Sequence, residues 1–216
     1  MRRRLWLLFP IVFLAACQDP DVFKVGTILV NSITQTPEMI ARDRVAAIPY
    51  ATMGLQLGAT PEVLLILGAQ NSSELDWYAG EDVFVRTRNG RVVRTVGLPY
   101  DLGGVRDALA VTNNAPSGAI PASAQYLLDF PDLGVFGATA QCSSKDMGDS
   151  KVQILGSELP TRHVAEHCVV QPMRWNFDND YWTDRANGFV WRSRQHVHPS
   201  LPPVNLEVFR PEQNPG

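Results

Sequence analysis

The sequence predicts a mainly β protein, built as an antiparallel curved sheet, a half-barrel or a sandwich, with one or two short helices. Short runs rich in β-branched and aromatic residues recur along the chain, and Gly, Pro, Asn and Asp separate them. Regular short strands with this punctuation favour an all-β architecture over an alternating α/β fold. The strand-like runs are residues 53–57, 62–68, 83–96, 126–130, 134–141, 152–155, 161–170, 173–177, 188–194 and 204–209.

The clearest local feature is a β-hairpin over residues 83–96. Asn89-Gly90 is typical of a type I′ turn, because both residues adopt positive φ at little cost. A two-residue turn predicts four cross-strand pairs, which are Arg88 with Arg91, Thr87 with Val92, Arg86 with Val93 and Val85 with Arg94. The face expected to be buried consists of Val83, Val85, Thr87, Val92 and Val96, with Arg94 as an interruption.

A helix is expected in the first quarter of the chain. Thr36 is a suitable N-cap, Pro37 fits the first helical position, and Glu38 favours the positive end of the helix dipole. The helix should end before Pro49. Its apolar face would consist of Met39, Ile40, Ala47 and Ile48. Residues 98–121 are rich in turn formers, so we expect at most a short helix there.

The N-terminus has the pattern of a secretory signal. Arg2–Arg4 precede an apolar run of 12 residues, Leu5–Ala16, which is shorter than the ~20 residues that span a bilayer. The tetrapeptide Leu14-Ala15-Ala16-Cys17 resembles the lipobox of bacterial lipoproteins, in which the signal is removed and the cysteine is acylated, for example with palmitate. Cys17 is therefore the predicted lipidation site and membrane anchor. An ordinary cleaved signal followed by an unmodified cysteine is the alternative.

Gln18 follows the predicted lipidation site, where Asp usually marks retention in the inner membrane in enterobacteria-like sorting. We therefore expect transport to the outer membrane, with the protein facing the periplasm, although Asp19 comes one position later. The expected organisation is a signal peptide over residues 1–16, a lipid-anchored tether over 17–26, a single β-rich domain over 27–211 and a C-terminal tail over 212–216.

The mature chain is acidic. Removal of residues 1–16 takes away three arginines, so 16 basic residues face 22 acidic ones and the formal net charge is −6. This balance argues against sequence-independent nucleic-acid binding, which draws on Lys and Arg at the phosphates. The sequence has no phosphate-cradling loop, dinucleotide fingerprint or Cys-x-x-Cys pair, and we predict no cofactor.

Lipidation of Cys17 would leave Cys142 and Cys168 as an even pair. Secretion places them in an oxidising compartment, where we expect a disulfide. Each cysteine lies in a strand-like run, so two adjacent antiparallel strands with the bridge between them would satisfy its geometry. Two free thiols are the alternative.

Histidines are candidates for a metal site. His163 and His167 are four residues apart. His196 and His198 are two apart. Residues with these spacings share one face of a strand, so a mononuclear site is geometrically open. The spacings match no recognised zinc motif. The alternative is that the histidines are hydrogen-bonded or partly exposed, and we predict no metal.

Carboxylates near the C-terminus are candidates for catalysis, namely Asp178, Asp180 and Asp184. Paired carboxylates hydrolyse glycosides when their separation in space is suitable, which the sequence does not give. Asp and Asn are also ordinary turn residues, so a solvated turn is the alternative. No Gly-x-Ser-x-Gly elbow or other catalytic motif occurs, and we expect no enzymatic activity.

Aromatic and arginine side chains are the candidates for glycan or partner contact. Aromatic rings stack on sugars, but they also fill cores and protein interfaces. The aromatic candidates are Trp175, Tyr181, Trp182 and Trp191. Arginines on the predicted hairpin would suit an acidic polysaccharide or lipid headgroups, with a solvated hairpin tip as the alternative. These arginines are Arg86, Arg88 and Arg91.

Three segments, together with the lipobox, carry a resemblance to a known family. They are residues 49–58 (PYATMGLQLG), 90–102 (GRVVRTVGLPYDL) and 175–184 (WNFDNDYWTD), the last continued by 188–195 (GFVWRSRQ). These segments resemble the YjbF/GfcB family, known as group 4 capsule polysaccharide lipoproteins. The resemblance covers nearly the whole mature chain.

The resemblance implies a mainly antiparallel β lipoprotein involved in exopolysaccharide or capsule production. Its implied partners are an outer-membrane β-barrel protein, a periplasmic protein and a polysaccharide exporter, and it supplies no catalytic residues. We therefore expect a non-enzymatic outer-membrane lipoprotein that assists assembly or export of an extracellular polysaccharide, by holding partner proteins or the glycan. The alternatives are a periplasmic carbohydrate-active enzyme and a lipid or acyl-chain carrier, which needs an apolar cavity of ~300 Å³ or more.

Overall fold

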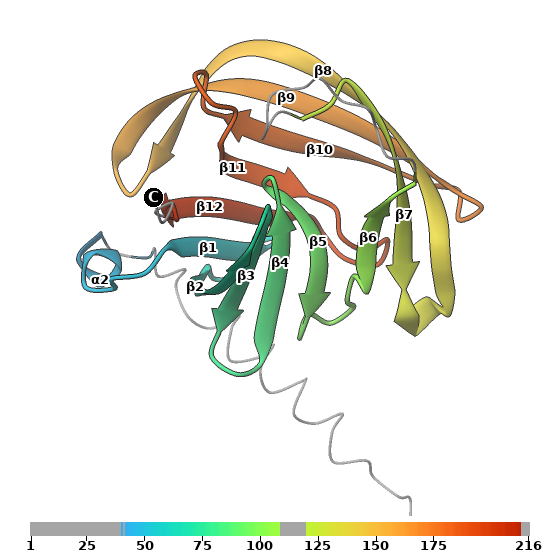
Figure 1. The fold of residues 1–216 in the computed structure, drawn as a ribbon, viewed down its shortest axis with the longest axis horizontal. Helices are drawn as coiled ribbons and strands as arrows, with labels where there is room; N and C mark the ends of the chain where they lie inside the picture. Colours follow the sequence, from blue (N-terminus) through green and yellow to red (C-terminus); the bar gives the residue numbers. More distant parts are fainter. Residues whose placement is uncertain (1–39, 41, 109–119, 213–216) are drawn as a thin grey trace, which may run out of the picture. The chain divides into compact units, whose positions relative to one another are not determined.

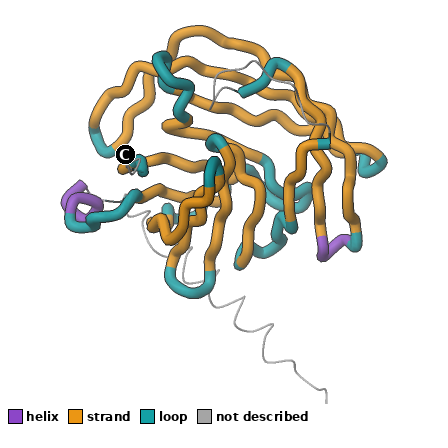
Figure 2. The backbone as a smooth tube through the Cα atoms, viewed as in Figure 1, coloured by secondary structure: helices purple, strands orange, loops and turns teal. Residues whose placement is uncertain are grey.

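Twelve antiparallel strands form one curved sheet in the computed structural model of the protein, which describes residue 40 and residues 42–108 and 120–212 (Figure 1). The order across the sheet is β5-β4-β3-β2-β1-β12-β11-β10-β9-β8-β7-β6, and Figure 2 shows how strands dominate this part of the chain. The strands are β1 (Thr52–Leu57), β2 (Val63–Asn71), β3 (Glu74–Ala79), β4 (Val83–Arg88), β5 (Arg91–Val96), β6 (Gly104–Asp107), β7 (Ser123–Phe130), β8 (Val135–Ile154), β9 (Ser157–Gln171), β10 (Trp175–Thr183), β11 (Val190–Gln195) and β12 (Val204–Arg210). The predicted mainly antiparallel, curved β fold is confirmed.

The chain builds this sheet as two meanders. The first runs from β1 to β5 and the second from β6 to β12, and β12 joins them by pairing with β1. Strands β5 and β6 follow one another in the chain but are the two edges of the sheet. The two edges lie close together. The backbone N–H of Thr95 in β5 donates to the carbonyl of Leu102 over 3.0 Å, and Leu102 lies just before the first residue of β6. The sheet is therefore nearly closed.

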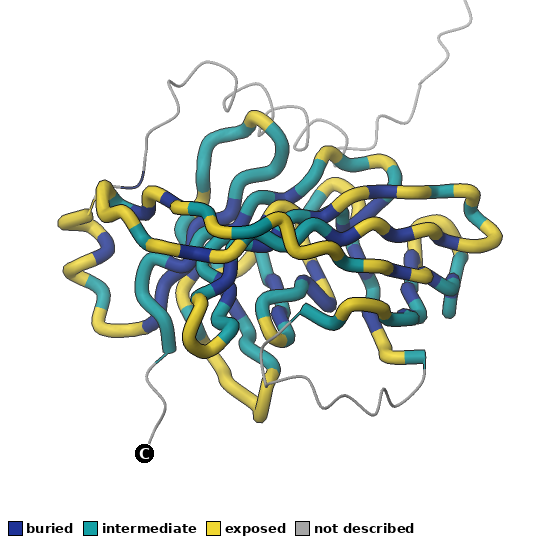
Figure 3. Tube along the Cα trace, turned by 90° about the horizontal axis from the view of Figure 1, so that it is seen from above, coloured by how far each residue is buried: buried dark blue, intermediate teal, exposed yellow. Residues whose placement is uncertain are grey.

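Side chains on the concave face of the sheet form the core, and those on the other face meet solvent. Buried and more exposed residues alternate along the strands (Figure 3), as expected when one face of a sheet is packed. In β12 the buried residues are Val204, Leu206 and Val208. Large side chains with less than 2% exposure come from both meanders and include Leu65, Trp77, Phe130 and Tyr181.

The predicted hairpin forms over β4 and β5. Asn89 and Gly90 have φ values of 49° and 77°, which a type I′ turn requires. Next to the turn, the predicted pairs of Arg88 with Arg91 and Thr87 with Val92 are confirmed.

Farther from the turn, the predicted register is wrong because of a β-bulge. The bulge lies between Arg86 and Thr87 in the pairing, and the observed pairs are Arg86 with Arg94, Val85 with Thr95 and Phe84 with Val96. The predicted pairs of Arg86 with Val93 and Val85 with Arg94 do not form. The extra residue on β5 reverses the direction of the side chains beyond it. Consequently Val93 and Thr95 are buried, whereas Val96, predicted to be buried, is 44% exposed.

Strand β8 is longer than the sequence predicts. Residues 134–141 and 152–155 were expected to be separate strands, but both belong to one strand of 20 residues that pairs with β9 along most of its length. The intervening segment is polar and largely exposed, so it lacks the apolar alternation that marks a strand in the sequence. Backbone hydrogen bonds to β9, and not the burial of side chains, hold this segment in the sheet.

Part of the predicted helix is described. Helix α2 (Arg42–Ala46) ends before Pro49, as expected, whereas the predicted start at Thr36 lies outside the described residues. Within the predicted apolar face, Ala47 is exposed, and Val45 is the buried residue of this short helix.

The turn-rich segment 98–121 contains strand β6, which the sequence does not predict. Residues 109–119 lie outside the described part, so the short helix expected in this segment is not addressed there. A 3-10 turn, η1 (Pro131–Leu133), connects β7 and β8.

Cys142 and Cys168 are directly opposite one another on β8 and β9 and form a disulfide. The predicted bridge between adjacent antiparallel strands is confirmed. Cys17, the predicted signal peptide and the predicted tether lie outside the described residues. In the described ranges, helices with the length and apolar character needed to cross a membrane do not occur.

Candidate functional site

A pocket of about 420 Å³ opens at one end of the curved sheet. We call it the aromatic pocket. Four segments surround it: the turn between β2 and β3, the tip of the β4–β5 hairpin, the loop between β10 and β11, and the end of β12. Its depth is apolar and buried, with Met53, Trp77, Leu206 and Val208. Its mouth is polar and exposed, with Gln70, Ser72, Ser73, Asn89 and Asn187.

Trp191 is fixed in the wall of this pocket by the loop between β10 and β11. Its indole N–H donates to Asp184 Oδ2 over 3.4 Å, and Asp184 Oδ1 accepts from the backbone N–H of Ala186 at 2.8 Å. The ring of Phe189 packs edge-on against Trp191, with 4.8 Å between the ring centroids. Asp184 therefore shapes the loop that carries Phe189 and also holds Trp191 at the start of β11, which are two of the three aromatic side chains that line the pocket.

Trp77 forms the third aromatic surface. Its indole N–H donates to the hydroxyl of Thr87 over 3.0 Å, on the neighbouring strand β4. The N–H groups of Trp77 and Trp191 are thus both bonded within the protein. Because their polar atoms are occupied, the rings offer the pocket apolar faces rather than hydrogen-bond donors.

The tip of the β4–β5 hairpin is held against β11. Gln195 binds it twice: its amide N–H donates to the carbonyl of Gly90 over 2.8 Å, and its carbonyl accepts from the backbone N–H of Val92 at 3.0 Å. A Cβ atom at Gly90 would collide with Val190, so only glycine permits this close approach. The turn residues therefore form a fixed wall of the pocket.

A buried ion pair lies behind this tip. Arg91 on β5 contacts Glu166 on β9 with 2.5 Å between Nη2 and Oε1, and the side chain of Glu166 is fully buried. The second carboxylate oxygen accepts from Asn179 at 3.1 Å and from the hydroxyl of Tyr181 at 3.3 Å. The guanidinium also lies over the ring of Tyr126, at 4.4 Å from the centroid. These contacts satisfy both charges inside the protein.

Arg91 and Tyr181 both keep their protons across ordinary pH. Burial opposes the charged form of Arg91, but Tyr181 and Glu166 outweigh it and raise the pKa of the guanidinium. Burial raises the pKa of Tyr181 well above its usual value of 10.0, so the phenol remains protonated and able to donate. Neither Arg91 nor Tyr181 therefore titrates near neutrality. Their contacts with Glu166 connect the two meanders.

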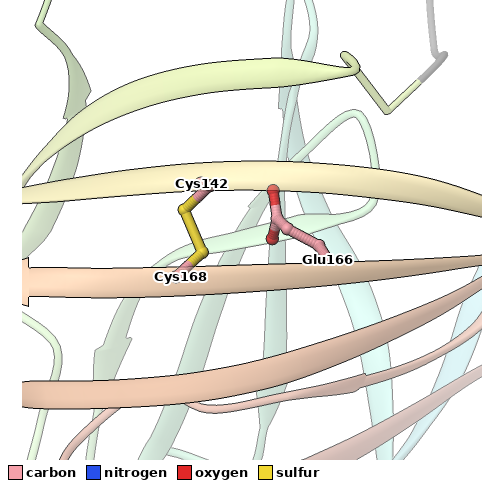
Figure 4. A group of neighbouring side chains, drawn as sticks. All are labelled: Cys142, Glu166 and Cys168. Carbon is pink, nitrogen blue, oxygen red and sulfur yellow. A yellow bond between two sulfur atoms is a disulfide. The ribbon is translucent and has the colours of Figure 1, made fainter.

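Glu166 also lies beside the disulfide (Figure 4). Candidate ligand atoms of Cys142, Cys168 and Glu166 all lie within 4.8 Å of one another. The two sulfur atoms are bonded to each other, so they are not thiolates, and thiolate is the form of cysteine that binds metals. The carboxylate is already engaged by Arg91 and Asn179. In this cluster the disulfide therefore packs in the core, and Glu166 compensates the charge of Arg91.

The structure separates the four predicted aromatic contact residues. Trp191 lines the aromatic pocket, whereas Tyr181 belongs to the buried ion-pair network. Trp175 packs against the core residue Phe130, with 5.9 Å between ring centroids. Trp182 stacks on the ring of His163 at 5.0 Å. Trp182 points away from Tyr181 because successive side chains of β10 lie on opposite faces of the sheet, and Trp191 belongs to a different strand, β11.

Two of the three predicted arginines lie together, because Arg86 and Arg88 both contact Glu74, and Arg91 is apart from them. Arg86 pairs with Asp76 at 2.6 Å, and Arg88 pairs with Glu74 at 2.6 Å, both across β3 and β4. Arg91 points instead to the buried Glu166.

The histidines and two of the three aspartates pair with one another across β9 and β10. His163 lies 2.7 Å from Asp180, and His167 lies 2.7 Å from Asp178. Neither aspartate lines the aromatic pocket, and Asp184 is engaged in shaping its loop. His198 is fully buried and stacks on Tyr100 instead of joining His196.

Sequence reasoning missed Trp77, Phe189, Glu166 and Gln195. Trp77 had a usable signal, because Leu75, Trp77 and Ala79 alternate with polar or exposed residues as in a half-buried strand. Glu166 and Gln195 had none, because a polar residue in a strand normally indicates the solvent face.

Comparisons with known proteins identify related chains. The sequence model described as "Group 4 capsule polysaccharide lipoprotein gfcB, YjbF" matches residues 14–209. The chain is 25% identical over 208 residues to the uncharacterized lipoprotein GfcB of Escherichia coli K12, covering 93% of this chain and 94% of that protein. It is 25% identical over 214 residues to the uncharacterized lipoprotein YjbF of the same organism, covering 94% and 96%. The crystal structure of the hypothetical lipoprotein YmcC from E. coli K12 has the same fold, with a TM-score of 0.64 and 22% identity over 92% of this chain and 99% of that one.

Proposed function

Because the chain belongs to the group 4 capsule polysaccharide lipoprotein family, as the resemblance predicted, we propose that it assists the assembly or export of an extracellular or capsular polysaccharide. It does so by holding the glycan in the aromatic pocket. The protein is a non-enzymatic binding component in this proposal, anchored by lipid at Cys17 to the outer membrane and facing the periplasm. Its partners are an outer-membrane β-barrel protein and polysaccharide-export proteins.

The aromatic pocket is the observation that supports glycan holding. A sugar ring has apolar C–H faces and polar hydroxyls at its edge, so it suits a site with aromatic faces and a polar rim. The pocket supplies Trp77, Phe189 and Trp191 in its walls, and amide and hydroxyl groups at its mouth. Its volume of about 420 Å³ lies within the range of ~300 to 1,000 Å³ typical of small-molecule sites.

Binding without catalysis agrees with the positions of the carboxylates. A glycosidase needs two carboxylates on either side of the bond that it cleaves. Asp178 and Asp180 are paired with histidines away from the aromatic pocket, and Asp184 accepts hydrogen bonds that hold the loop. Glu212, the one acidic side chain among the described residues of the pocket lining, is a single carboxylate.

Gene deletion and complementation test this function. We expect deletion to reduce surface polysaccharide and the wild-type gene to restore it. Trp191→Ala should restore it poorly, because the pocket loses an aromatic wall, whereas Trp182→Ala on the opposite face of the sheet should restore it fully. Both variants must accumulate to the wild-type level for this comparison. Unchanged polysaccharide after deletion would refute the proposal.

The anchor has its own test. Cys17→Ser should release a folded protein from the membrane fraction and leave polysaccharide output unrestored, because the pocket would no longer be held at the site of export. Full restoration by this variant would show that lipidation is dispensable.

A lipid or acyl-chain carrier is the second candidate. The apolar depth of the aromatic pocket favours it, since the volume of about 420 Å³ exceeds the ~300 Å³ that such a carrier requires. The polar mouth favours the glycan. A fluorescent fatty acid distinguishes the two, because the carrier binds it stoichiometrically and Trp77→Ala weakens that binding, whereas a glycan site leaves it in solution.

A further inference from the structure

A second hollow lies on the other side of the β4–β5 hairpin tip. It has a volume of about 190 Å³ and is lined by Arg88, Asn89, Arg91, Val105, Asp107 and Tyr126, among others. Asn89 lines both this hollow and the aromatic pocket. We propose that the two hollows form one path for a single polysaccharide chain, which crosses from one to the other over Asn89. This inference rests on the glycan-holding function proposed above.

The size of the second hollow favours an extension over an independent site. At about 190 Å³ it is smaller than the ~300 Å³ at which separate small-molecule sites begin. It has room for part of a ligand whose remainder lies elsewhere. The aromatic pocket, which shares Asn89 as a wall residue, is the adjoining space.

The hairpin tip is a fixed divider between the two hollows. Gln195 bonds to the backbone of Gly90 in the turn and of Val92 just after it, and Arg91 is paired with the buried Glu166. A ligand chain therefore passes over the tip and not through it. The exposed residue at that point is Asn89, whose side-chain amide can both donate and accept hydrogen bonds.

The charges in the second hollow indicate a neutral, hydroxyl-rich sugar unit. Arg88 is paired with Glu74 at 2.6 Å and with Asp107 at 3.4 Å. Arg91 is paired with Glu166. An acidic sugar would meet compensated arginines and the carboxylate of Asp107, whereas hydroxyls can bond to the partly exposed Arg88 and Asp107 without breaking a buried pair.

Binding of polysaccharide fragments of graded length tests this path. The full-length protein in detergent is titrated calorimetrically with fragments prepared by partial acid hydrolysis of the polysaccharide that the producing cells release. A two-site path predicts that affinity rises by about tenfold once the fragment is long enough to fill both hollows. A single site predicts equal affinity for short and long fragments, which would overturn the inference.

Asn89→Gly is the diagnostic variant, because glycine keeps the positive φ of the turn and removes only the side chain. It should abolish the tenfold gain of long fragments over short ones, whatever the loss of this residue from the mouth of the aromatic pocket does to the binding of short fragments. Asp149→Ala, which removes an exposed carboxylate paired with Arg185, is the matched control and should retain the gain. Wild-type behaviour of Asn89→Gly with long fragments would contradict the path. Failure of every fragment to bind would refute the proposed function itself.

Discussion

Arg91 and Glu166, which are 75 residues apart in the sequence, form an ion pair of 2.5 Å in the interior of the curved sheet. Arg91 follows the hairpin turn of the first meander, and Glu166 lies in the middle of β9 in the second. The pair therefore ties the hairpin tip to the opposite side of the sheet. The ion pair thereby also fixes the position of the hairpin tip, which forms one wall of the aromatic pocket.

Glu166→Ala should lower the free energy of unfolding by about 3 to 5 kcal/mol, because it leaves the guanidinium of Arg91 buried without its partner. Urea unfolding followed by circular dichroism measures this. Glu158→Ala is the control, since it removes an exposed partner of Lys151 and should cost at most about 1 kcal/mol. Equal losses in the two variants would show that the buried pair has no special role.

Loss of the disulfide should also destabilise the protein. Cys142 and Cys168 are 26 residues apart, and closing a loop of that length contributes about 3.5 kcal/mol in the chain-entropy model. We expect the double Ser variant to lose about this amount in denaturant unfolding. Reducing agent should bring the wild type toward the variant and leave the variant unchanged. A wild type that is insensitive to complete reduction would contradict this.

Gly97 allows the chain to leave β5. Its φ is 88°, and a Cβ atom there would collide with the carbonyl oxygen of Asp82. Gly97→Ala should therefore cost about 2 to 4 kcal/mol, from backbone strain and the clash together. Gly134→Ala is the matched control, because φ is 62° but the space around the position is open, and it should cost about 1 kcal/mol. Thermal unfolding of both variants measures the difference. Similar losses of stability in the two variants would show that the clash with Asp82 does not contribute.

Glu62 should make stability depend on pH. Burial and the nearby Glu207 raise the pKa of Glu62 to about 7, although Arg192 opposes this. The folded state therefore holds this proton more tightly than the unfolded state, whose pKa is near 4.5. The resulting stabilisation is complete below the unfolded pKa and disappears as the pH rises through about 7.

Glu62→Gln should remove this dependence, because the amide remains neutral. Relative to the wild type, the variant should gain about 1 kcal/mol between pH 5 and pH 8, a figure reduced for the partial exposure of the side chain. Melting temperatures at several pH values measure the gain. Glu81→Gln, at an exposed position, is the control. A constant difference between Glu62→Gln and the wild type would contradict the assignment.

Local patterns in the sequence predict local structure here. The Asn89-Gly90 turn and the strand-like run of residues 204–209 carry their own signals, because turn residues and alternating burial act over a few positions. The disulfide was predictable because the predicted lipidation of Cys17 left a single pair of cysteines, each in a strand-like run. The bulge beside Thr87 was not, since no residue type at that point signals an extra residue in β5.

The candidate site was less predictable, because its parts come from distant segments. Trp77 and Trp191 line one pocket only because β1 and β12 pair and bring the two meanders together. Sequence proximity instead grouped Trp191 with Trp182, which the β10 and β11 strands place elsewhere. Buried polar residues such as Glu166 are unpredictable for the same reason, since their partners are set by the tertiary fold.

Calorimetric titration of the purified protein with the released polysaccharide decides whether the aromatic pocket holds the glycan. We expect saturable binding by the wild type, about tenfold weaker binding by Trp191→Ala, and unchanged binding by Trp182→Ala. Failure of the wild type to bind, or equal weakening by the two tryptophan variants, would contradict the claim that the aromatic pocket holds the glycan.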